Sequence, residues 1–393
     1  MTSKPKVGVL FAVSFTFFFA RAFMFATWVS RGPEVKELLG LNTVQMGVLT
    51  MLYPAAGLLG ISYASALVQR FGSRSVATAI FATGSVSLAL LGPAITSGQV
   101  LLTSVLLLTF GGPMAIADFV ANYEGNFADR ASRHSLFPAL HGAYGVGMMI
   151  GSAIAGALTA SKLDLGVHYL MIAATAGVAS LGAAFLIPRH DTSATTPEER
   201  AEQRRQRRAV LRERHSLTIA LVGFSFIMAE MSAGTWIPIA LTNSGVSAAN
   251  AAFALSVLWV MVTVVRLLGG FIVDRLGRHR TVFVSAVVTA LGIALFMVGD
   301  GEVLRYVALA LWGGGMAVGF PLSVSTMGDD PAWAAARINL GVSVVYLASI
   351  TVGPALGAVG QVFGLTVAFG IPLVMAIVAA LLSGVTKQRS TTV

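Results

Sequence analysis

The sequence predicts an all-α membrane protein with twelve transmembrane helices in two pseudo-symmetric six-helix bundles. Of its 393 residues, 56% are hydrophobic and only 11% are charged, a balance that the surface of a water-soluble domain of this size would not tolerate. Six apolar runs precede a polar stretch at residues 188–215 and six follow it. Each run is close to the roughly 20 residues that cross a hydrocarbon core. Matching features recur in the two halves, which indicates an internal repeat.

The apolar runs set the expected helices and the domain boundaries. The expected spans are residues 7–29, 44–68, 75–95, 99–122, 135–160, 166–187, 216–240, 248–273, 281–299, 303–326, 334–360 and 363–385. The first bundle is therefore assigned to residues 1–188, a basic linker to 189–215 and the second bundle to 216–393. Since no small-residue cleavage site follows the first run, we interpret it as a retained helix and not as a signal peptide.

Positive charge is concentrated on one side of the predicted membrane. The net charge is +9, and all but six of the 26 lysines and arginines fall on the side that holds both termini. The six exceptions are Arg31, Lys36, Lys162 and Arg305 on the opposite side and Arg21 and Arg266 within helices. This is the positive-inside pattern, which places both termini in the cytoplasm and makes nucleic-acid binding a poor explanation of the charge. We expect the linker to be solvated and attracted to anionic lipid headgroups.

Several chemistries are excluded by what the sequence lacks. There is no cysteine, so disulfides, thiolate metal sites and cysteine catalysis are ruled out. Neither HExxH nor GxSxG occurs, and no GxxxxGK[ST] phosphate-binding loop is present. We therefore expect no enzyme, no metal site and no cofactor or ATP drive. A membrane sensor that binds a ligand without transporting it stays as an alternative.

The clearest repeat joins the first helix of each half. Phe15–Trp28 reads FTFFFARAFMFATW and carries Arg21 in its middle, and Phe224–Trp236 reads FSFIMAEMSAGTW and carries Glu230. The two charges are 209 residues apart, and each segment closes on a Thr-Trp pair. A charge in lipid is costly and usually faces a cavity or a partner. We therefore predict that Arg21 and Glu230 lie at equivalent depths and form an ion pair that differs between conformations.

A second repeat lies in the turns after helices 2 and 8. Gly270, Asp274, Arg275, Gly277 and Arg278 match the signature GxxxDRxGRxR, and by it the chain resembles the major facilitator superfamily. The resemblance covers the whole chain and implies that this turn is a gating element, whose acid and arginines tie cytoplasmic helix ends together.

The first-half copy of that turn departs from the signature. It keeps Arg70, Gly72 and Arg74, but Gln69 stands where aspartate is usual and Ser73 where arginine is usual. We expect the second-half turn to matter more for gating.

Four short motifs narrow the resemblance. Asp118 and Asn122 in helix 4, His141 in helix 5, Glu230 in helix 7 and Arg266 in helix 8 resemble the fucose-permease-like and rhizopine-transporter-like group of bacterial uptake carriers. That resemblance implies proton-linked uptake of a sugar, polyol or amino-polyol across the bacterial inner membrane.

Each candidate in the first half also has a structural reading. Asp118 and Asn122 are four residues apart and share a helix face. Asp118 is a candidate proton site, or a structural acid held by an arginine or a helix end. His141 and Tyr144 are three apart, and His141 could relay protons or bridge helices by hydrogen bonds.

The remaining candidates, most of them in the second half, also allow more than one explanation. Glu230 is a candidate ligand for substrate or proton, and Arg21 a candidate for holding a substrate carboxylate or hydroxyl. Arg266 could snorkel inward or pair with Asp118. Trp236 could stack on a sugar or serve as an interfacial anchor.

The sequence thus predicts a monomeric secondary transporter of a small molecule that works by alternating access and is driven by a proton gradient. We expect a cavity lined by helices 1, 4, 5, 7, 8, 10 and 11. Export of amphipathic drugs or metabolites in exchange for protons is the alternative within transport.

Overall fold

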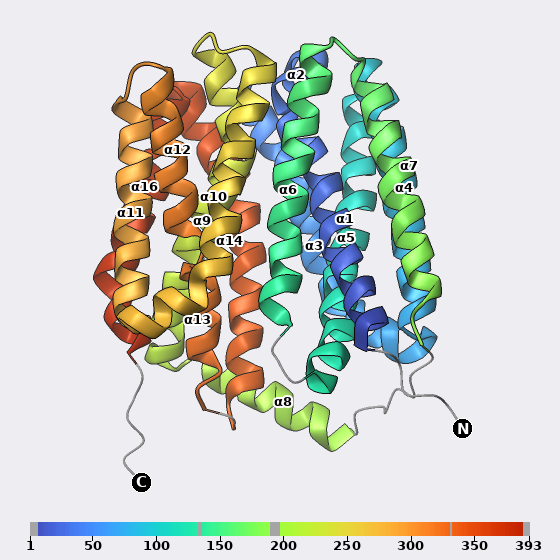
Figure 1. The fold of residues 1–393 in the computed structure, drawn as a ribbon, viewed down its shortest axis with the longest axis vertical. Helices are drawn as coiled ribbons and strands as arrows, with labels where there is room; N and C mark the ends of the chain where they lie inside the picture. Colours follow the sequence, from blue (N-terminus) through green and yellow to red (C-terminus); the bar gives the residue numbers. More distant parts are fainter. Residues whose placement is uncertain (1–6, 133–135, 189–196, 331, 388–393) are drawn as a thin grey trace. The chain divides into compact units, whose positions relative to one another are not determined.

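Every regular element is a helix in the part of the chain that the structure describes. The structure is a computed structural model that describes residues 7–132, 136–188, 197–330 and 332–387 (Figure 1). Within these ranges, twelve helices or broken helices are long and apolar enough to cross a membrane. The predicted number of spans is therefore confirmed.

The helices follow the predicted runs to within a few residues at most ends. The first half contains α1 (Val7–Ser30), α2 (Gly32–Leu38), α3 (Thr43–Phe71), α4 (Ser73–Thr96), α5 (Val100–Ala131), α6 (Phe137–Ala160) and α7 (Leu165–Phe185). The linker helix α8 (Pro197–Val210) is followed by α9 (Arg214–Asn243), α10 (Ala248–Leu276), α11 (Arg278–Val298), α12 (Glu302–Met316), α13 (Gly319–Met327) and α14 (Ala334–Phe363). The chain closes with α15 (Leu365–Ala368), α16 (Gly370–Leu382) and the 3₁₀ turn η1 (Ser383–Thr386).

The chain divides by packing into two compact units. Unit 1 comprises Met1–Ser193 and Gly234–Trp259, and unit 2 comprises Ala194–Ala233 and Val260–Val393. The helices α9 and α10 each pass from one unit into the other. The repeat boundaries at residues 188 and 215 stay a prediction, because grouping by packing is not a test of duplication.

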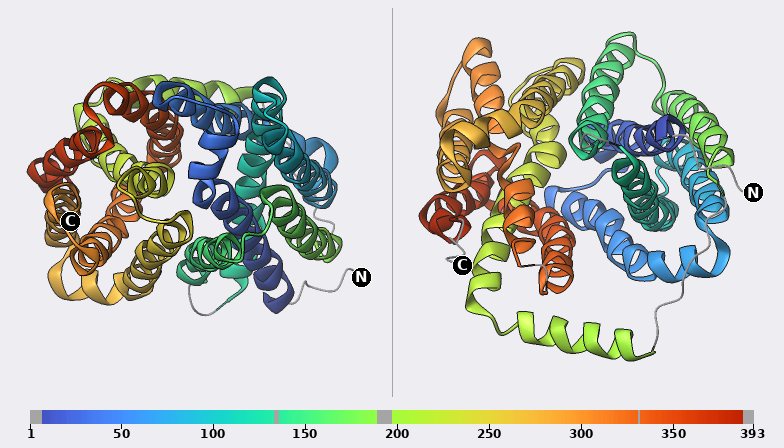
Figure 2. Two further views of the ribbon diagram at one scale, coloured as in Figure 1. Left: turned by 90° about the horizontal axis from the view of Figure 1, so that it is seen from above. Right: turned by 60° about the horizontal axis from the view of Figure 1, so that its bottom comes forward.

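In unit 1 the helices pack in pairs through small residues. The most extensive pairs are α1 with α6, α3 with α5 and α4 with α7, and Figure 2 shows these helices nearly end-on. A Cβ atom on Gly147 would lie 2.5 Å from the Phe19 carbonyl oxygen, and one on Gly111 would lie 2.1 Å from that of Tyr53. Lipid gives no hydrophobic drive for helix association, so such close backbone contact supplies the dispersion energy that holds the helices together.

The two glycine turns of the predicted repeat have the same backbone conformation. Gly72, between α3 and α4, has φ 77° and ψ 150°, and Gly277, between α10 and α11, has φ 75° and ψ 155°. A side chain would be strained at these positive φ values, which explains glycine at both positions. The match supports the sequence alignment of the two turns.

Span 10, expected as one helix over 303–326, is interrupted. The α-helical hydrogen bonding stops after Met316, at the end of α12, and resumes at Gly319, the start of α13. A Cβ atom on Gly319 would lie 2.3 Å from the ring of Phe226 in α9. The glycine-rich sequence WGGGMAVGFP allows this close approach and weakens the helix at the same place.

Two short helices lie outside the spans. The first predicted external loop holds α2, as its Gly-Pro start suggests. The linker helix α8 begins at Pro197, and proline suits the first turn of a helix because the N–H it lacks would be unpaired there. Helix α8 runs crosswise to α9 and α14 of its own unit (Figures 1 and 2).

Candidate functional site

An ion pair joins two helices inside unit 1. The Arg21 Nη2 atom of α1 lies 2.8 Å from the Asp118 Oδ1 atom of α5, and the two side chains are 20% and 33% exposed. Hydrogen bonds between ionised groups are about twice as strong as neutral ones. Arg21 is thus held against α5 while part of both side chains stays accessible.

Aromatic side chains flank this pair. The Arg21 guanidinium carbon lies 4.6 Å from the centre of the Tyr144 ring in α6. The buried Trp259 of α10, also part of unit 1, meets Tyr144 edge to face at 6.0 Å between ring centres. The cation–π contact between Arg21 and Tyr144 stabilises the arginine without neutralising its charge. Trp259 was not among the predicted site residues, although a tryptophan within an apolar run is visible in the sequence.

The other first-half candidates are placed less directly. The Asn122 amide donates a hydrogen bond of 2.8 Å to the Asp118 backbone carbonyl, so it turns back onto its own helix. The exposed His141 ring lies 5.0 Å from that of Phe18. The structure therefore brings Arg21, Asp118 and Tyr144 together and places Asn122 and His141 beside them.

A second ion pair lies inside unit 2. The Arg266 Nη2 atom of α10 lies 2.8 Å from Glu230 Oε2 of α9, and Glu230 is only 7% exposed at its side chain. Arg266 Nε also donates a 3.0 Å hydrogen bond to the carbonyl oxygen of Ala317. That carbonyl lies at the interruption between α12 and α13, where the regular helical partner is lost. One guanidinium thus links the Glu230 carboxylate to the broken helix.

Each of these four charges has a partner within its own unit. Arg21 pairs with Asp118 in unit 1, and Glu230 pairs with Arg266 in unit 2. A neighbouring helix thus compensates each of the four charges over a short distance. The predicted pairing of Arg21 with Glu230 and the alternative pairing of Arg266 with Asp118 would each join the two units, and both stay predictions.

The tryptophan predicted as a stacking platform is buried. Trp236 is 0% exposed, so no face of its ring is accessible in this structure. Its indole Nε1 atom is buried as well, without a hydrogen-bond partner among the described residues.

At the turn between α10 and α11, Arg278 is the residue that ties helix ends together. Its guanidinium forms two hydrogen bonds to the Asp329 carboxylate, at 2.9 and 2.6 Å, and donates to the Thr386 carbonyl at 3.2 Å. Asp274 was expected to act as the acid of this tie. It is exposed, and no described residue pairs with it, because the carboxylate that reaches Arg278 comes from the end of α13 instead.

The remaining turn residues make local contacts. Arg275 lies over the Phe271 ring at 4.1 Å, Arg70 over Phe71 at 5.2 Å and Arg74 over Phe185 at 5.2 Å. Gly270 has open space where a Cβ atom would be. No ion pair joins Arg70 or Arg74 to a described carboxylate, in keeping with the missing aspartate at position 69.

Two further charged groups were not among the predicted site residues. Glu124 in α5 is fully buried, two residues after Asn122. Arg31 is 1% exposed and donates to Thr159 and to the Leu163 carbonyl, which fixes the start of α2 against the α6–α7 turn. Charged residues next to apolar runs were the available signal, but the sequence does not give their partners.

The carboxylates outside the spans respond to their surroundings. Burial raises the pKa of Glu34 in α2, and the nearby Arg31 charge only partly opposes this. Burial by itself would raise the pKa of Glu213. Hydrogen bonds from Ser216 and from Arg337 of α14, together with the Arg337 charge, lower this pKa by more than burial raises it. The pKa of Glu213 therefore lies below its ordinary value of 4.5.

The fold and the two ion pairs are typical of a polytopic membrane transporter. The sequence matches the Major Facilitator Superfamily over residues 13–337. The chain therefore belongs to the Major Facilitator Superfamily, a family of transporters and not of enzymes. The predicted family and fold class are confirmed.

Two known proteins resemble this chain in sequence, one over nearly its whole length and the other over part of it. An uncharacterised MFS-type transporter of Yersinia pestis is 26% identical over 387 residues, which is 98% of this chain and 97% of the relative. The membrane protein MosC of Rhizobium meliloti is 27% identical over 152 residues, 38% of this chain and 36% of its own.

Solved structures share the fold at low sequence identity. The nucleoside transporter NupG superimposes with a TM-score of 0.78 and 16% identity, covering 96% of this chain and 98% of its own. A D-xylose-proton symporter superimposes with a TM-score of 0.74 and 15% identity, covering 96% of each chain. The E. coli fucose:proton symporter FucP superimposes with a TM-score of 0.65 and 17% identity, covering 96% of this chain and 98% of its own.

Proposed function

We propose that this protein takes up a small polar solute, such as a sugar, polyol or amino-polyol, together with protons by alternating access. The observation that carries the proposal is the presence of two arginine–carboxylate pairs, Arg21–Asp118 and Arg266–Glu230, within spans that are mostly apolar. Charged residues inside a membrane are costly and commonly mark the path of a substrate or an ion.

The chemistry of each pair fits solute–proton coupling. A guanidinium and a carboxylate together offer several donors and acceptors, the groups that recognise hydroxyls on a neutral solute. When a proton neutralises the carboxylate, the arginine loses its charge partner and its donors become available. A ligand that binds one charge state more tightly shifts the conformational equilibrium by that difference in affinity.

The names of structural neighbours support the choice of solute and ion. The D-xylose-proton symporter and the fucose:proton symporter move hydroxyl-rich solutes with protons, by their names, and NupG moves nucleosides. Their low identity to this chain shows the fold alone, so solute and coupling ion are parts of the proposal. The proton gradient is the driving force, and no cofactor is needed.

Localisation completes the proposal. The positive-inside pattern favours the bacterial cytoplasmic membrane with both termini inside, and we propose a monomer that contacts anionic lipid headgroups near the linker helix α8. Of its basic residues, Arg205, Arg207 and Arg208 are exposed.

A ligand-stabilisation screen tests the proposed site. Sugars, inositols, amino sugars and carboxylates are added to the purified wild type and to Glu230→Gln and Arg21→Ala, with Glu302→Gln at an exposed position as the control. A solute at one hundred times its Kd stabilises the folded protein by about 2.7 kcal/mol. We expect at least one neutral polyhydroxylated solute to raise the unfolding temperature of the wild type and the control, but not of the two variants.

Two outcomes would contradict the proposal. Equal shifts in all four proteins would remove Glu230 and Arg21 from the site. Stabilisation by amphipathic cations, with none by any sugar or polyol, would favour the drug-export alternative. Retained helical circular dichroism and a single size-exclusion peak establish that each variant is folded.

A further inference from the structure

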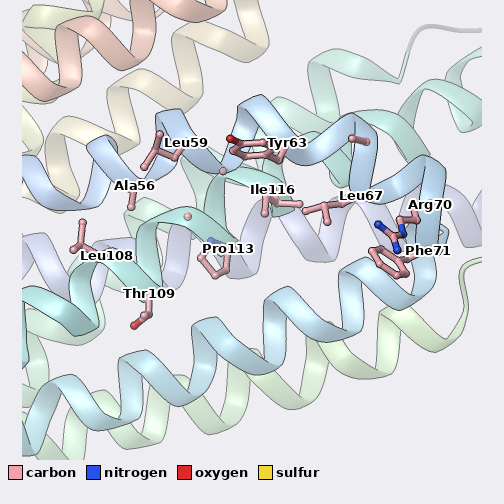
Figure 3. A pocket seen from close by; sticks show the side chains of 13 residues that line it. Ala56, Leu59, Tyr63, Leu67, Arg70, Phe71, Leu108, Thr109, Pro113 and Ile116 are labelled. Atoms are coloured by element: carbon pink, nitrogen blue, oxygen red, sulfur yellow. The ribbon is translucent and has the colours of Figure 1, made fainter. Parts of the chain in front are cut away.

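Unit 1 contains a groove that none of the ion pairs uses. It has a volume of about 670 Å³ and is formed by α3 and α5, within the size range of ligand sites in proteins. Figure 3 shows Arg70 and Phe71 together at one end and Ala56 and Leu108 at the other. The lining between these ends is almost wholly apolar, with Leu59, Tyr63, Leu67 and Ile116 among its side chains.

The groove lies where α3 and α5 pack against each other through glycine. A Cβ atom on Gly60 would lie 2.4 Å from the Gly112 carbonyl oxygen, so the backbones meet there. Both glycines line the groove, next to Pro113 of α5. Small side chains such as Ala56 and Ala66 leave the space beside this contact unfilled.

The groove is accessible from outside the protein. Leu59 is 65% exposed and Tyr63 is 64% exposed, although both lie in the middle of a membrane span. An exposed apolar surface at this depth is suited to hydrocarbon and not to water.

The charge at the end of the groove indicates an anionic headgroup. Arg70 lies in the last turn of α3, at the predicted cytoplasmic boundary, and Arg74 opens α4 four residues later. Their guanidinium groups contact aromatic rings, and neither forms an ion pair with a carboxylate among the described residues. An exposed arginine, Arg70, and a half-buried one, Arg74, beside an apolar groove match a phosphate joined to an acyl chain.

The length of the groove fits one lipid leaflet. Ala56 precedes Arg70 by 14 residues, which is about 21 Å of helix at 1.5 Å per residue. Half of a bilayer of about 40–45 Å, its headgroup regions included, is about 20–22 Å. A chain that starts from a phosphate at Arg70 therefore runs along the groove without leaving its leaflet.

We propose that the α3–α5 groove binds one anionic phospholipid of the cytoplasmic leaflet. Its phosphate contacts Arg70, with Arg74 adding to the local positive charge, and one acyl chain lies between Tyr63 and Pro113. This site is separate from the proposed solute site, because none of its lining residues belongs to the two intramembrane ion pairs.

Native mass spectrometry of the purified full chain tests this site. Phosphatidylglycerol and phosphatidylcholine are titrated separately onto the wild type, Arg70→Ala, Arg70→Lys and Ala66→Phe. The control is Arg280→Ala, an exposed arginine at the start of α11 in unit 2. Loss of the Arg70 charge is expected to weaken phosphatidylglycerol binding about fivefold, which corresponds to about 1 kcal/mol per basic residue near a membrane surface.

The variants separate headgroup from tail. Arg70→Lys keeps the charge and is expected to bind within about twofold of the wild type. Ala66→Phe fills the groove from an exposed position and is expected to reduce binding of both lipids, while Arg280→Ala changes neither. Added glycerol phosphate, which has the headgroup chemistry without a tail, is expected not to compete.

Three results would overturn the proposal. Arg70→Ala and Arg280→Ala could bind phosphatidylglycerol equally, which would mean ordinary annular lipid. Ala66→Phe could leave binding unchanged, so that the groove would hold no tail. Glycerol phosphate could compete as well as the lipid, in which case the site would be for a soluble anion.

Discussion

At the residue scale, each intramembrane charge is compensated by a residue on a neighbouring helix. Arg21 pairs with Asp118, and Arg266 pairs with Glu230 and the Ala317 carbonyl. Removing one member of such a pair leaves the other charged and partly buried, which costs more than the pair contributes. Replacing a carboxylate by its amide is therefore the gentler test, because it removes the charge and keeps the shape.

The ion pair Glu213–Arg337 gives a residue-scale prediction about pH. The folded-state pKa of Glu213 lies below its ordinary value of 4.5, so its stabilising contribution is fully present above that pH. The contribution is lost as the pH falls through the lower pKa of the folded state. In thermal unfolding followed by circular dichroism, Glu213→Gln should be less stable than the wild type at pH 7, with a difference that shrinks below pH 4.5.

The matched control for that prediction is Glu202→Gln on helix α8, where the side chain is exposed. It should follow the wild type throughout the titration. A Glu213→Gln defect that stays constant from pH 7 down to the acid limit would show that the Arg337 contact does not depend on the carboxylate charge.

At the element scale, helix pairs are held by backbone contact at glycine. The α3–α5 crossing is the tightest example, since a Cβ atom on Gly111 would lie 2.1 Å from the Tyr53 carbonyl oxygen. On the other side of the bundle, Gly182 of α7 has nothing within 4 Å of the same position. Two glycines in helix interiors thus differ only in their neighbours.

Gly111→Ala should destabilise the protein although alanine is the better helix former. Forcing a methyl group into packed backbone typically costs about 1–3 kcal/mol, while the gain in helix propensity is at most about 1 kcal/mol. Gly182→Ala should be neutral or slightly stabilising. Unfolding temperatures of both variants in one detergent test this, and equal or higher stability of Gly111→Ala would contradict the packing described for α3 and α5.

The sequence predicts the elements far better than their interruptions. Twelve apolar runs fix the number of spans, and the turns at Gly72 and Gly277 were identified from a signature that both halves share in part. The interruption between α12 and α13 was missed because its residues stay apolar, and hydropathy does not register a lost hydrogen bond. The α3–α5 groove was missed for a similar reason, since it depends on how two helices cross.

At the scale of the whole molecule, the repeat predicts where charges lie but not which charges meet. Arg21 and Glu230 hold matching positions in the sequence of the two halves. Pairing depends on helix rotation and on which neighbour reaches the charge, and these follow from packing over many residues. The sequence therefore identified Arg21, Asp118, Glu230 and Arg266 as candidates, but it did not predict the pairs Arg21–Asp118 and Arg266–Glu230.

The proposed transport cycle depends on protons moving together with a neutral solute. Purified protein is placed in liposomes that contain a pH-sensitive dye, and L-fucose, D-xylose, uridine or myo-inositol is added outside at equal pH. The proteins compared are the wild type, Glu230→Gln and the exposed control Glu302→Gln. Counterflow of labelled solute is measured in the same preparations, because it reports binding and alternating access without net proton movement.

We predict that a solute that stabilises the wild type also acidifies the liposome interior, and that Glu302→Gln does the same. Glu230→Gln should lose the acidification, because its amide cannot carry the proton whose exchange frees Arg266. Solute entry with no acidification in the wild type, or equal acidification in Glu230→Gln, would contradict coupling through the Arg266–Glu230 pair.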